Sequence, residues 1–278
     1  MTNNKKANSV LLINDMAGYG KVALSVMIPI FSHLGCETYN LPTALVSNTL
    51  DYGKFDILDT TGYMQNSINV WEQLGFSFDA VCTGFIVSDR QSQLIYDYCM
   101  KQKEKGAKVF VDPIMGDDGH LYNGVSPATV EYMKRLCGIA DVIIPNITEA
   151  CFIAGLPADK KCCGADDIST LLDCLQQNGA KSVVITSVPM ADGMCTIVKK
   201  HGEEGWTKIP YTEIPVRFPG TGDIFTSIVT GSCLKGGRLE DAVRKAMDTV
   251  VKLITANFGN ADKYKGIPIE QYLDDIEC

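Results

Sequence analysis

A short glycine-containing segment near residue 220 carries the residues best suited to chemistry. It reads Gly220-Thr221-Gly222-Asp223, and apolar residues at helical spacing follow it directly: Ile224, Phe225, Ile228 and Val229. Two glycines within three residues free the backbone, so that its amides can turn towards a common point. The first turn of a helix also gathers unpaired N–H groups and the positive end of the helix dipole. The segment therefore predicts an anion site, suited to a phosphate, at the start of a buried helix.

The aspartate of this segment, Asp223, has two interpretations. It can be the N-cap of the helix, because aspartate is among the residues favoured at that position. It can instead be a general base that takes a proton from a hydroxyl group while the neighbouring amides stabilise a transferring phosphoryl group. The spacing alone leaves both interpretations open.

Composition narrows the class of protein and the kind of partner. The chain has 278 residues, 46% of them hydrophobic, which suffices for one large α/β domain. A formal net charge of −8 argues against nucleic acid or an anionic membrane as the main partner. No apolar run reaches the roughly 18 residues of a membrane helix, and the polar N-terminus has no signal-peptide pattern, so we expect a cytoplasmic protein.

The cysteines predict thiols rather than cross-links. There are 11 of them, an odd number, and no C-x-x-C pair occurs. Cys82, Cys151 and Cys233 lie inside apolar segments. Buried free thiols in a reducing compartment are the expectation, in preference to disulfides or a metal site.

Strands and helices are expected to alternate along the chain. We predict strands at residues 9–15, 37–46, 80–85, 108–113, 141–146, 182–187, 194–199 and 206–211. We predict helices at residues 22–34, 57–74, 89–105, 221–235 and 239–257, two more beginning at Ser126-Pro127 and Thr148-Glu149, and a last short one within 267–276. Such alternation predicts a mostly parallel sheet with helices on both faces. No linker interrupts it, so we expect a single domain over residues 1–278.

Polar residues recur where the predicted strands end. They are Asp15, Ser47, Thr83, Asp112, Asn146, Thr186 and Ser187. In an open α/β sheet, ligands bind at the carboxyl ends of the strands. These side chains therefore predict a binding site along one edge of the sheet.

The order of motifs resembles a known group of enzymes. The motifs are the acid Asp15 followed by a glycine turn, Thr83-Gly84-Phe85, residues 112–117, residues 140–146 with Glu149 after them, residues 184–187, and Gly220-Thr221-Gly222-Asp223. Together they resemble the ribokinase-like superfamily, and within it the pyridoxal and pyridoxamine kinase branch, which is related to hydroxymethylpyrimidine kinase. The resemblance covers residues 10–259, and it implies a ribokinase-like fold.

This resemblance also implies ATP-dependent phosphorylation of a primary alcohol on a small ring. It makes Asp223 the base that deprotonates the hydroxymethyl group, with Gly220, Thr221 and Gly222 holding the transferred phosphate. The positions that match the lining of the ATP phosphates are Asn146, Thr186, Ser187 and Thr221. Those that match the acids around Mg²⁺ and an activating monovalent cation, K⁺, are Asp112, Asp117 and Glu149. Mg²⁺ keeps much of its hydration shell, so contact through water is expected.

Several residues also have purely structural interpretations. Asp112 precedes Pro113 and can serve only to end a strand. Glu149, near a helix start, can interact favourably with the helix dipole. Asp118 and His120 are expected to be solvated loop residues rather than ligands.

The positions expected around the substrate ring are Asp15, Ser47, Thr49, Phe85 and Tyr122. Phe85 matches a position where pyridoxal kinases often place a tyrosine against the pyridine ring, so we expect either stacking or an ordinary core phenylalanine. Asp15 stands where those enzymes often have serine, which favours the hydroxymethylpyrimidine enzymes. Asp223 stands where the latter commonly have cysteine, which favours the pyridoxal kinases.

The function expected from the resemblance is phosphorylation of the 5′-hydroxymethyl group of pyridoxal, pyridoxine or pyridoxamine by ATP. The nearest alternative is a hydroxymethylpyrimidine (phosphate) kinase of thiamine biosynthesis. A dinucleotide-dependent oxidoreductase is disfavoured because no G-x-G-x-x-G follows the first strand. A non-catalytic vitamin-binding protein is a further alternative. By analogy with the family we expect a homodimer, and residues 50–61 are the candidate for a lid over the substrate.

Overall fold

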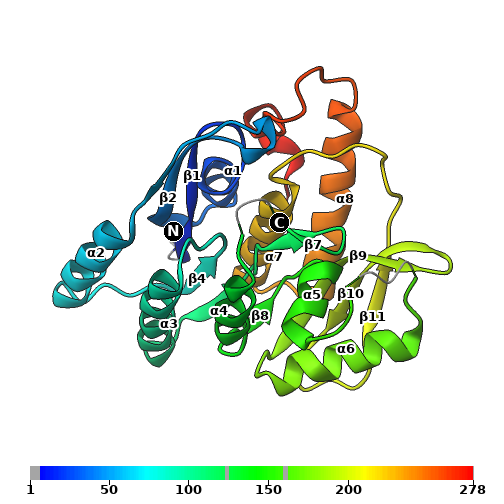
Figure 1. The fold of residues 1–278 in the computed structure, drawn as a ribbon, viewed down its shortest axis with the longest axis horizontal. Helices are drawn as coiled ribbons and strands as arrows, with labels where there is room; N and C mark the ends of the chain where they lie inside the picture. The colour runs from blue at the N-terminus through cyan, green and yellow to red at the C-terminus, as the bar shows by residue number, and fades with distance from the viewer. Residues whose placement is uncertain (1–6, 123–124, 159–161, 278) are drawn as a thin grey trace, which may run out of the picture.

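The computed structural model describes residues 7–122, 125–158 and 162–277, and in them helices cover a central sheet (Figure 1). Its strands lie in the order β11-β10-β9-β8-β5-β4-β1-β2-β3. Their bounds are β1 (Ser9–Tyr19), β2 (Glu37–Asn48), β3 (Ile57–Asp59), β4 (Ala80–Thr83), β5 (Lys108–Val111), β8 (Val142–Ile143), β9 (Ser182–Met190), β10 (Gly193–Lys199) and β11 (Thr207–Pro210). A separate small hairpin consists of β6 (Gly116–Asp117) and β7 (His120–Leu121).

The centre of the sheet is parallel and its two edges are antiparallel. Strands β2, β1, β4, β5, β8 and β9 pair in parallel, whereas β3 pairs with β2, and β10 with β9 and β11, in the antiparallel sense. The inner parallel strands β1, β4 and β5 carry apolar runs that are buried on both faces; residues 10–13 of β1 have no exposed surface. The predicted α/β fold is confirmed.

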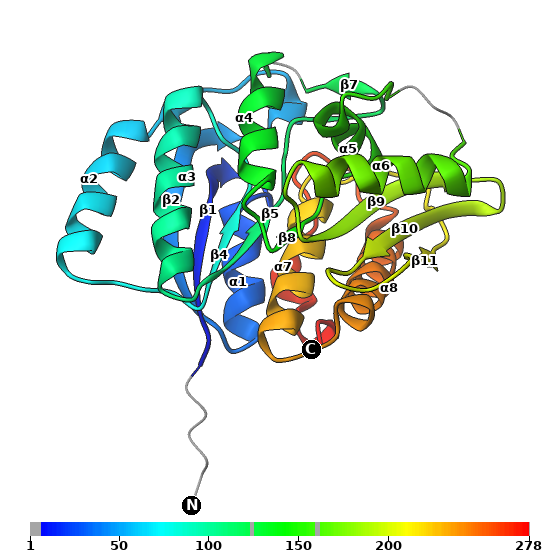
Figure 2. The ribbon, with the colours of Figure 1, turned by 90° about the horizontal axis from the view of Figure 1, so that it is seen from below.

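Helices form a layer on each face. Their bounds are α1 (Leu24–His33), α2 (Thr61–Gln73), α3 (Asp89–Glu104), α4 (Ala128–Cys137), α5 (Ile147–Ala154), α6 (Ala165–Gln177), α7 (Thr221–Leu234) and α8 (Leu239–Asn257). Helices α2 to α6 share one core with Leu11 and Ile13 of β1, while α1, α7 and α8 share another with Val10 and Leu12. The split follows from the alternation of side chains along a strand. Figure 2 shows the two layers on either side of the sheet.

Three predicted segments differ in the structure. Residues 57–59 are the edge strand β3 rather than helix, because they pair with β2; α2 begins only at Thr61, whose N–H bonds to Asp59 Oδ1 at 2.7 Å. Helix α4 begins after Pro127, and Ser126 contributes its carbonyl, to the N–H of Thr129, instead of a side-chain cap. The tail within residues 267–276 forms two 3₁₀ turns, η2 (Ile269–Gln271) and η3 (Leu273–Asp275), instead of an α-helix.

Helix α6 was not among the predicted elements, although its sequence carries a helical pattern. Ile168, Leu171, Leu172 and Leu175 are buried at helical spacing. Its first turn is tied by the N–H of Gly164, which donates to Asp167 Oδ2 at 2.7 Å. The helix covers the sheet beside β9, next to α5.

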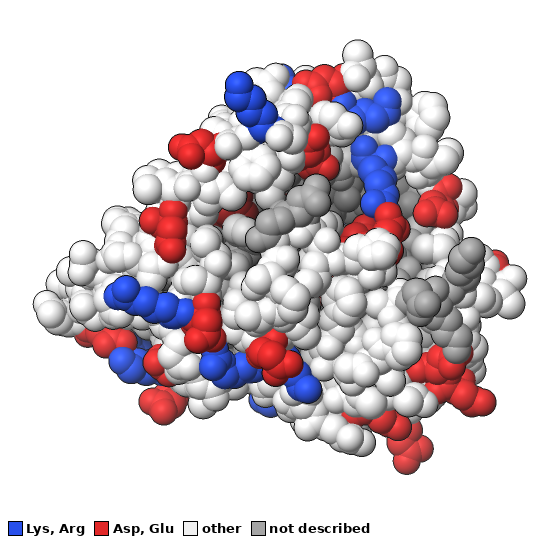
Figure 3. All heavy atoms as spheres, in the orientation of Figure 1, with Lys and Arg blue, Asp and Glu red and all other residues white. Residues whose placement is uncertain are grey.

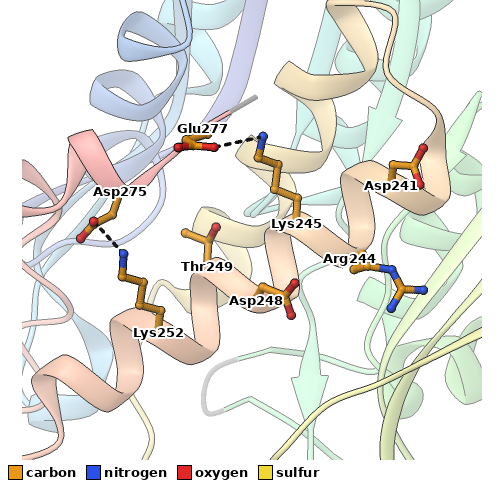
Figure 4. Close-up of a pocket in the computed structure, with 8 residues that line it drawn as sticks. All are labelled: Asp241, Arg244, Lys245, Asp248, Thr249, Lys252, Asp275 and Glu277. Atoms are coloured by element: carbon orange, nitrogen blue, oxygen red, sulfur yellow. Dashed lines mark hydrogen bonds and ion pairs between the residues drawn. The ribbon is translucent and has the colours of Figure 1, made fainter.

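The end of the described chain is fastened along α8, at a surface groove of about 350 Å³. Lys252 pairs with Asp275 at 2.7 Å, and Lys245 approaches Glu277 at 4.0 Å (Figure 4). Ile276 between these acids is buried. The groove is lined by α8 and by the tail residues Asp275 and Glu277, and it contains none of the predicted site residues.

The structure also bears on two predictions made from composition, that the cysteines are free thiols and that no helix spans a membrane. Cys82, Cys99 and Cys151 are buried free thiols, as expected, whereas Cys233 is only partly buried. Burial raises the pKa of the Cys99 thiol to about 12, which keeps it protonated and unreactive. Among the described residues, no helix combines the length and the hydrophobicity needed to cross a bilayer.

Candidate active site

The predicted polar residues gather at the carboxyl ends of the parallel strands. Asp15 lies in β1, Asp112 follows β5, and Asn146 follows β8. Asn146 bridges to Thr186 of β9, and Asp223 comes to the same edge from the start of α7. Because parallel strands end at one edge of a sheet, residues far apart in the chain meet there.

Asp223 is not an N-cap, so the first interpretation of this residue is wrong. The N-cap of α7 is Gly220, in a left-handed conformation with φ of 86°, and Asp223 is the third helical residue. A Cβ on Gly220 would lie 2.2 Å from the carbonyl oxygen of Lys21, so only glycine fits there. Gly222, by contrast, is exposed and has open space around it.

The Asp223 side chain is buried and held by groups from the other end of the chain. Its Oδ1 accepts from Asn14 Nδ2 at 3.1 Å, and its Oδ2 accepts from the N–H of Ala23 at 2.8 Å. Burial raises the pKa of Asp223 to about 6, against the opposing effect of these two hydrogen bonds. From the described residues each oxygen accepts one hydrogen bond, so each retains capacity for another. At neutral pH the group is therefore an ionised carboxylate of increased basicity.

Two more acids lie close to Asp223. Asp112 is buried, and its Oδ2 accepts from the Thr226 hydroxyl of α7 at 2.8 Å. Burial and then the charge of Asp223 raise the pKa of Asp112 to about 7. The same two causes raise the pKa of the half-buried Asp15 to about 7. Three carboxyl groups thus share a poorly hydrated region, and the hydrogen-bond partners of Asp112 and Asp223 among the described residues are all neutral.

Asn146 and Glu149 form a capping box at the start of α5. Asn146 Oδ1 accepts from the Glu149 N–H, and Glu149 Oε2 accepts from the Asn146 N–H, both at 2.9 Å. Glu149 Oε1 also accepts from the N–H of Met115 at 3.0 Å and of Gly116 at 3.5 Å. Burial, followed by the charge of Asp112, raises the pKa of Glu149 well above its usual value. The structural interpretation of Glu149 is therefore correct in part, since its carboxylate already fastens the helix start.

The β6–β7 hairpin is tied to the segment before α7. Arg217 pairs with Asp118 at 2.7 Å and with Asp117 at 3.3 Å. Asp118 is exposed, as predicted, and so is His120 on β7. Asp117 is half-buried, and burial raises its pKa. Arg217 was not among the predicted site residues, although it lies only three residues before Gly220.

The described acids do not form a direct metal cage. No group of three or more His, Cys, Asp or Glu side chains among the described residues is arranged to ligate one ion. Asp117 faces Arg217, and both oxygens of Glu149 accept backbone N–H groups. The oxygen-rich set of Asp112, Asp117 and Glu149 fits a hydrated Mg²⁺ that reaches the carboxylates through water.

Of the five residues expected around the substrate, Asp15 and Phe85 lie next to Asn14, Ser47 and Thr49 make other contacts, and Tyr122 follows the β6–β7 hairpin. Phe85 is half-buried, and its N–H bonds to Asn14 Oδ1, beside Asp15. Ser47 is exposed and its Oγ is engaged by Asn48 and by the N–H of Asp56. The buried Thr49 hydroxyl donates to the carbonyl of Tyr264 at 2.7 Å. Tyr122 is exposed after β7, and its N–H bonds to Met115.

Of the other positions expected at the nucleotide, Thr186 and Ser187 lie in β9, and Thr221 begins α7. The N–H of Thr186 donates to the carbonyl of Pro145 at 2.9 Å, which keeps β9 beside Asn146. Ser187 has a positive φ of 57°, a strained conformation for a non-glycine residue. The Thr221 hydroxyl donates to the carbonyl of Phe218 at 3.1 Å.

The contacts that hold Asp223 and Asp112 were missed by sequence reasoning. Asn14, Ala23 and Thr226 supply them. Asn14 could have been identified from the sequence, because it is a polar residue directly after the apolar run of residues 10–13. Ala23 acts through its backbone, and its residue type carries no such signal.

Comparison with known proteins places this chain. The family model of phosphomethylpyrimidine kinase matches residues 28–267. A solved structure of a Bacteroides thetaiotaomicron protein assigned as a phosphomethylpyrimidine kinase is 33% identical, with a TM-score of 0.92 over 100% of this chain and 96% of that chain. A second crystal form of that protein, with pyridoxal, has a TM-score of 0.91 at the same identity of 33%, over 98% of this chain and 96% of that chain.

Pyridoxal kinases are similar over nearly the whole chain as well. The pyridoxal kinase of Lactobacillus plantarum is 26% identical, with a TM-score of 0.88 over 97% of this chain and 96% of that chain. Pyridoxal kinase PdxY of Corynebacterium diphtheriae is 25% identical over 273 residues, 94% of this chain and 93% of its own length. The chain belongs to the phosphomethylpyrimidine kinase family, in its ribokinase-like pyridoxal kinase branch.

Proposed function

We propose that the protein transfers the γ-phosphoryl group of ATP to the 5′-hydroxymethyl group of pyridoxal, pyridoxine or pyridoxamine. The observation that carries the proposal is the buried Asp223 carboxylate at the first turn of α7, held from two sides at a helix start that has no side-chain cap. A phosphotransferase acting on an alcohol needs such a base next to an anion site. The similarity to named pyridoxal kinases and to a protein crystallised with pyridoxal supports the substrate class.

Asp223 would begin the reaction by accepting the proton of the hydroxymethyl group. The alcohol oxygen then forms a bond to the γ-phosphorus as the bond to the β–γ bridging oxygen breaks, so the products are the phosphate ester and ADP. The amides of Gly220, Thr221 and Gly222 would stabilise charge on the transferred group. Asp223 finally releases its proton to solvent. Asn146, Thr186 and Ser187 are our candidates for contacts with the other phosphates of ATP.

Mg²⁺ is proposed to reach Asp112, Asp117 and Glu149 through water, with K⁺ as the activating monovalent cation. A bound Mg²⁺ neutralises charge on the triphosphate. Asp112, Asp117 and Glu149 supply only oxygen donors, and those of Glu149 already bind backbone amides. The protein's own part is to hold these acids close to the phosphate site despite their mutual repulsion.

Phosphorylation of hydroxymethylpyrimidine is a second candidate on the same site. One observation favours it: Asp15, proposed to lie at the substrate ring, is a carboxyl group close to Asp223 whose pKa is raised by burial and by the charge of Asp223. A carboxyl group there can exchange hydrogen bonds with ring nitrogens or an exocyclic amine. The chemistry at Asp223 would be the same for both rings.

The wider setting is also a proposal. We infer one kinase domain in the cytoplasm that acts on small molecules and not on nucleic acid or membranes; acidic and basic side chains are interspersed over the face in Figure 3. A homodimer is supported by exposed apolar side chains around the β3 edge of the sheet: Leu45, Leu58, Tyr63, Val70 and Leu74. Sedimentation equilibrium tests the dimer.

The deciding experiment is ATP consumption by the purified protein with pyridoxal, pyridoxine, pyridoxamine and hydroxymethylpyrimidine offered separately. Turnover on the B6 vitamers that is lost in Asp223→Asn supports the proposed reaction and its base. Turnover on the pyrimidine alone selects the second candidate. No turnover on any of the four refutes both.

A further inference from the structure

Asn14 occupies a central position in the site, although it was not among the residues expected to act. Its side chain is buried at the end of the apolar part of β1. Its Nδ2 donates to Asp223 Oδ1 at 3.1 Å, and its Oδ1 accepts from the N–H of Asp15 at 3.0 Å and of Phe85 at 2.8 Å. One amide thus joins the base to two backbone positions expected at the substrate ring.

The surrounding backbone is shaped to admit this amide. A Cβ on Gly84 would lie 2.4 Å from Asn14 Nδ2, so glycine is required beside it. On the other side of the carboxylate, Ala23 has a φ of 48°, a sparsely populated value for a non-glycine residue, and its N–H bonds to Asp223 Oδ2. Strained residues of this kind cluster at functional sites.

We propose that Asn14 is a positioning residue, which orients the Asp223 carboxylate towards the substrate wall formed by Asp15 and Phe85. This inference rests on the proposed role of Asp223 as the base. Asn14 holds one carboxylate oxygen and Ala23 the other, so the plane of the carboxylate is set before substrate arrives. A base held in this way loses little entropy at the moment of proton transfer.

The substitution Asn14→Asp removes the hydrogen-bond donor of this side chain and keeps its acceptor, so it tests the contact with Asp223 separately from the contacts with the backbone. An aspartate has the same shape and keeps an oxygen for the N–H groups of Asp15 and Phe85, but it presents a second carboxyl oxygen to Asp223 instead of a donor. Two carboxyl groups at this separation share a proton, so the acid limb of the pH–kcat profile should move to higher pH. We expect kcat to fall on the order of 10- to 100-fold, the effect of a misplaced group, with the KM for the vitamer within about threefold.

The titratable groups that face Asp223 must be considered in reading that profile. They are Asp15 on β1, Cys82 on β4 and Asp112 after β5. Selective carbon-13 labelling of aspartate carboxyl groups resolves the titration of Asp223 itself, whose signal is identified by its loss in Asp223→Asn. In Asn14→Asp the Asp223 signal should titrate at higher pH than in the wild type.

Gln91→Glu is the matched control. Gln91 is also a fully buried amide that accepts a backbone N–H, that of Val87 at 3.0 Å, and donates to a backbone carbonyl, that of Thr43 at 2.8 Å. Within the described part of the chain, its hydrogen bonds go to Val87, Thr43 and Thr61, away from Asn14 and Asp223. The substitution should lower thermal stability while leaving the acid limb and the Asp223 titration in place.

The outcomes separate this inference from the proposed function. Wild-type kcat and an unmoved acid limb in Asn14→Asp overturn the positioning role while the kinase assignment stands. If the wild type phosphorylates none of the candidate alcohols, the proposed function fails, and an unchanged Asp223 titration then overturns the contact between the two residues as well. If Asn14→Asp does not fold, Asn14→Ser, which adds no charge and is too short to reach Asp223, decides by the same readouts.

Discussion

The carboxylates at the amino ends of the parallel strands and those at the carboxyl ends differ in their hydrogen-bond partners and in the direction of their pKa shifts. At the amino edge, Asp141 precedes β8 and accepts from Lys181 at 2.8 Å, from the Val109 N–H at 2.9 Å and from Lys103 at 3.1 Å. Burial would raise the pKa of Asp141, but these bonds together hold it below the usual value. At the carboxyl ends of the strands, Asp112 and Asp223 have neutral hydrogen-bond partners among the described residues, and their pKa values are raised.

The contrast shows which acids stabilise the fold and which cost stability. Asp141 and its lysines, like Asp79 with the N–H of Ser9 at 2.7 Å, lock strand starts together. The acids of the other edge repel one another and are poorly hydrated. Such uncompensated groups persist where cations or reacting groups supply the missing partner. From this comparison we infer that the acids at the amino ends of the strands stabilise the fold and that those at the carboxyl ends serve the chemistry. Four experiments test this inference.

The largest difference is expected in turnover. Asp223→Asn should lower kcat by at least roughly 100-fold, the lower end for loss of a general base, because the amide cannot accept the alcohol proton. Asp141→Asn should leave kcat within about twofold, since it acts far from the reacting groups. Steady-state kinetics on both variants checks this. Equal turnover in Asp223→Asn and the wild type would falsify the base assignment.

The second difference concerns the metal requirement. Glu149→Gln should raise the Mg²⁺ concentration for half-maximal activity on the order of 10-fold, because a carboxylate that supports a metal site typically contributes that much. Asp79→Asn, at the opposite edge, is the control and should leave the titration unchanged. Activity is measured against Mg²⁺ at fixed ATP, with circular dichroism to confirm the fold. A Glu149→Gln titration that overlays the wild type removes Glu149 from the metal set.

The pH dependence of turnover follows from the raised pKa of Asp223. The base must be ionised, so kcat should fall as pH drops through about 6, by about tenfold for each further pH unit. Asp141→Asn should leave this limb in place, because the pKa of Asp141 lies below that range. The measurement is kcat between pH 5 and 9 at saturating substrate. A limb that stays flat down to pH 5 contradicts an Asp223 pKa near 6.

The smallest effects are expected in stability, with opposite signs at the two edges. Asp141→Ala leaves Val109 and two lysines without their acceptor and should cost about 1–3 kcal/mol, or roughly 2–4 °C in Tm for each kcal/mol. Asp112→Asn should raise the Tm of the ligand-free protein above pH 7, because it removes a buried charge while an amide oxygen can still accept from Thr226.

The sign of the pH effect on stability follows from linkage. The folded pKa values of Asp15, Asp112 and Asp223 lie above the usual 3.8, at about 7, 7 and 6. Their contribution to stability is complete below pH 4 and is lost as pH rises through 6 to 7. Asp112→Asn should flatten this fall in thermal scans of the ligand-free protein. The same fall in Asp112→Asn as in the wild type would show that Asp112 does not contribute to it.

Much of the fold could be predicted because its signals are local. Apolar runs ending in Asp15, Asp112 or Asn146 marked both the parallel strands and the edge where the acids meet. Strand β3 was not predicted, because its three residues form a strand only by pairing with β2. The missed α6 is different, since its apolar spacing was readable in the chain.

The site could be predicted only in part, for a physical reason. Residue types indicated the acids, but their roles depend on tertiary partners. Whether Asp223 capped its helix depended on where Gly220 places the helix start. The hydrogen bonds of Ser47 with Asp56 and of Thr49 with Tyr264 could not be predicted either, because these residues meet only in the folded chain.

The clamp on Asp223 also has a consequence for the order in which the protein becomes active. Asn14 and Ala23 lie 209 and 200 residues before the carboxylate that they hold. Closing so long a loop contributes late and slowly to folding. While a ribosome makes the chain, the strand that carries Asn14 emerges among the first residues, but the base joins it only when α7 packs on α1. A nascent chain therefore contains Asp15 and Phe85 of the proposed substrate wall before it contains the proposed base, Asp223. We therefore expect phosphoryl transfer to begin only after α7 has been made and has packed on α1.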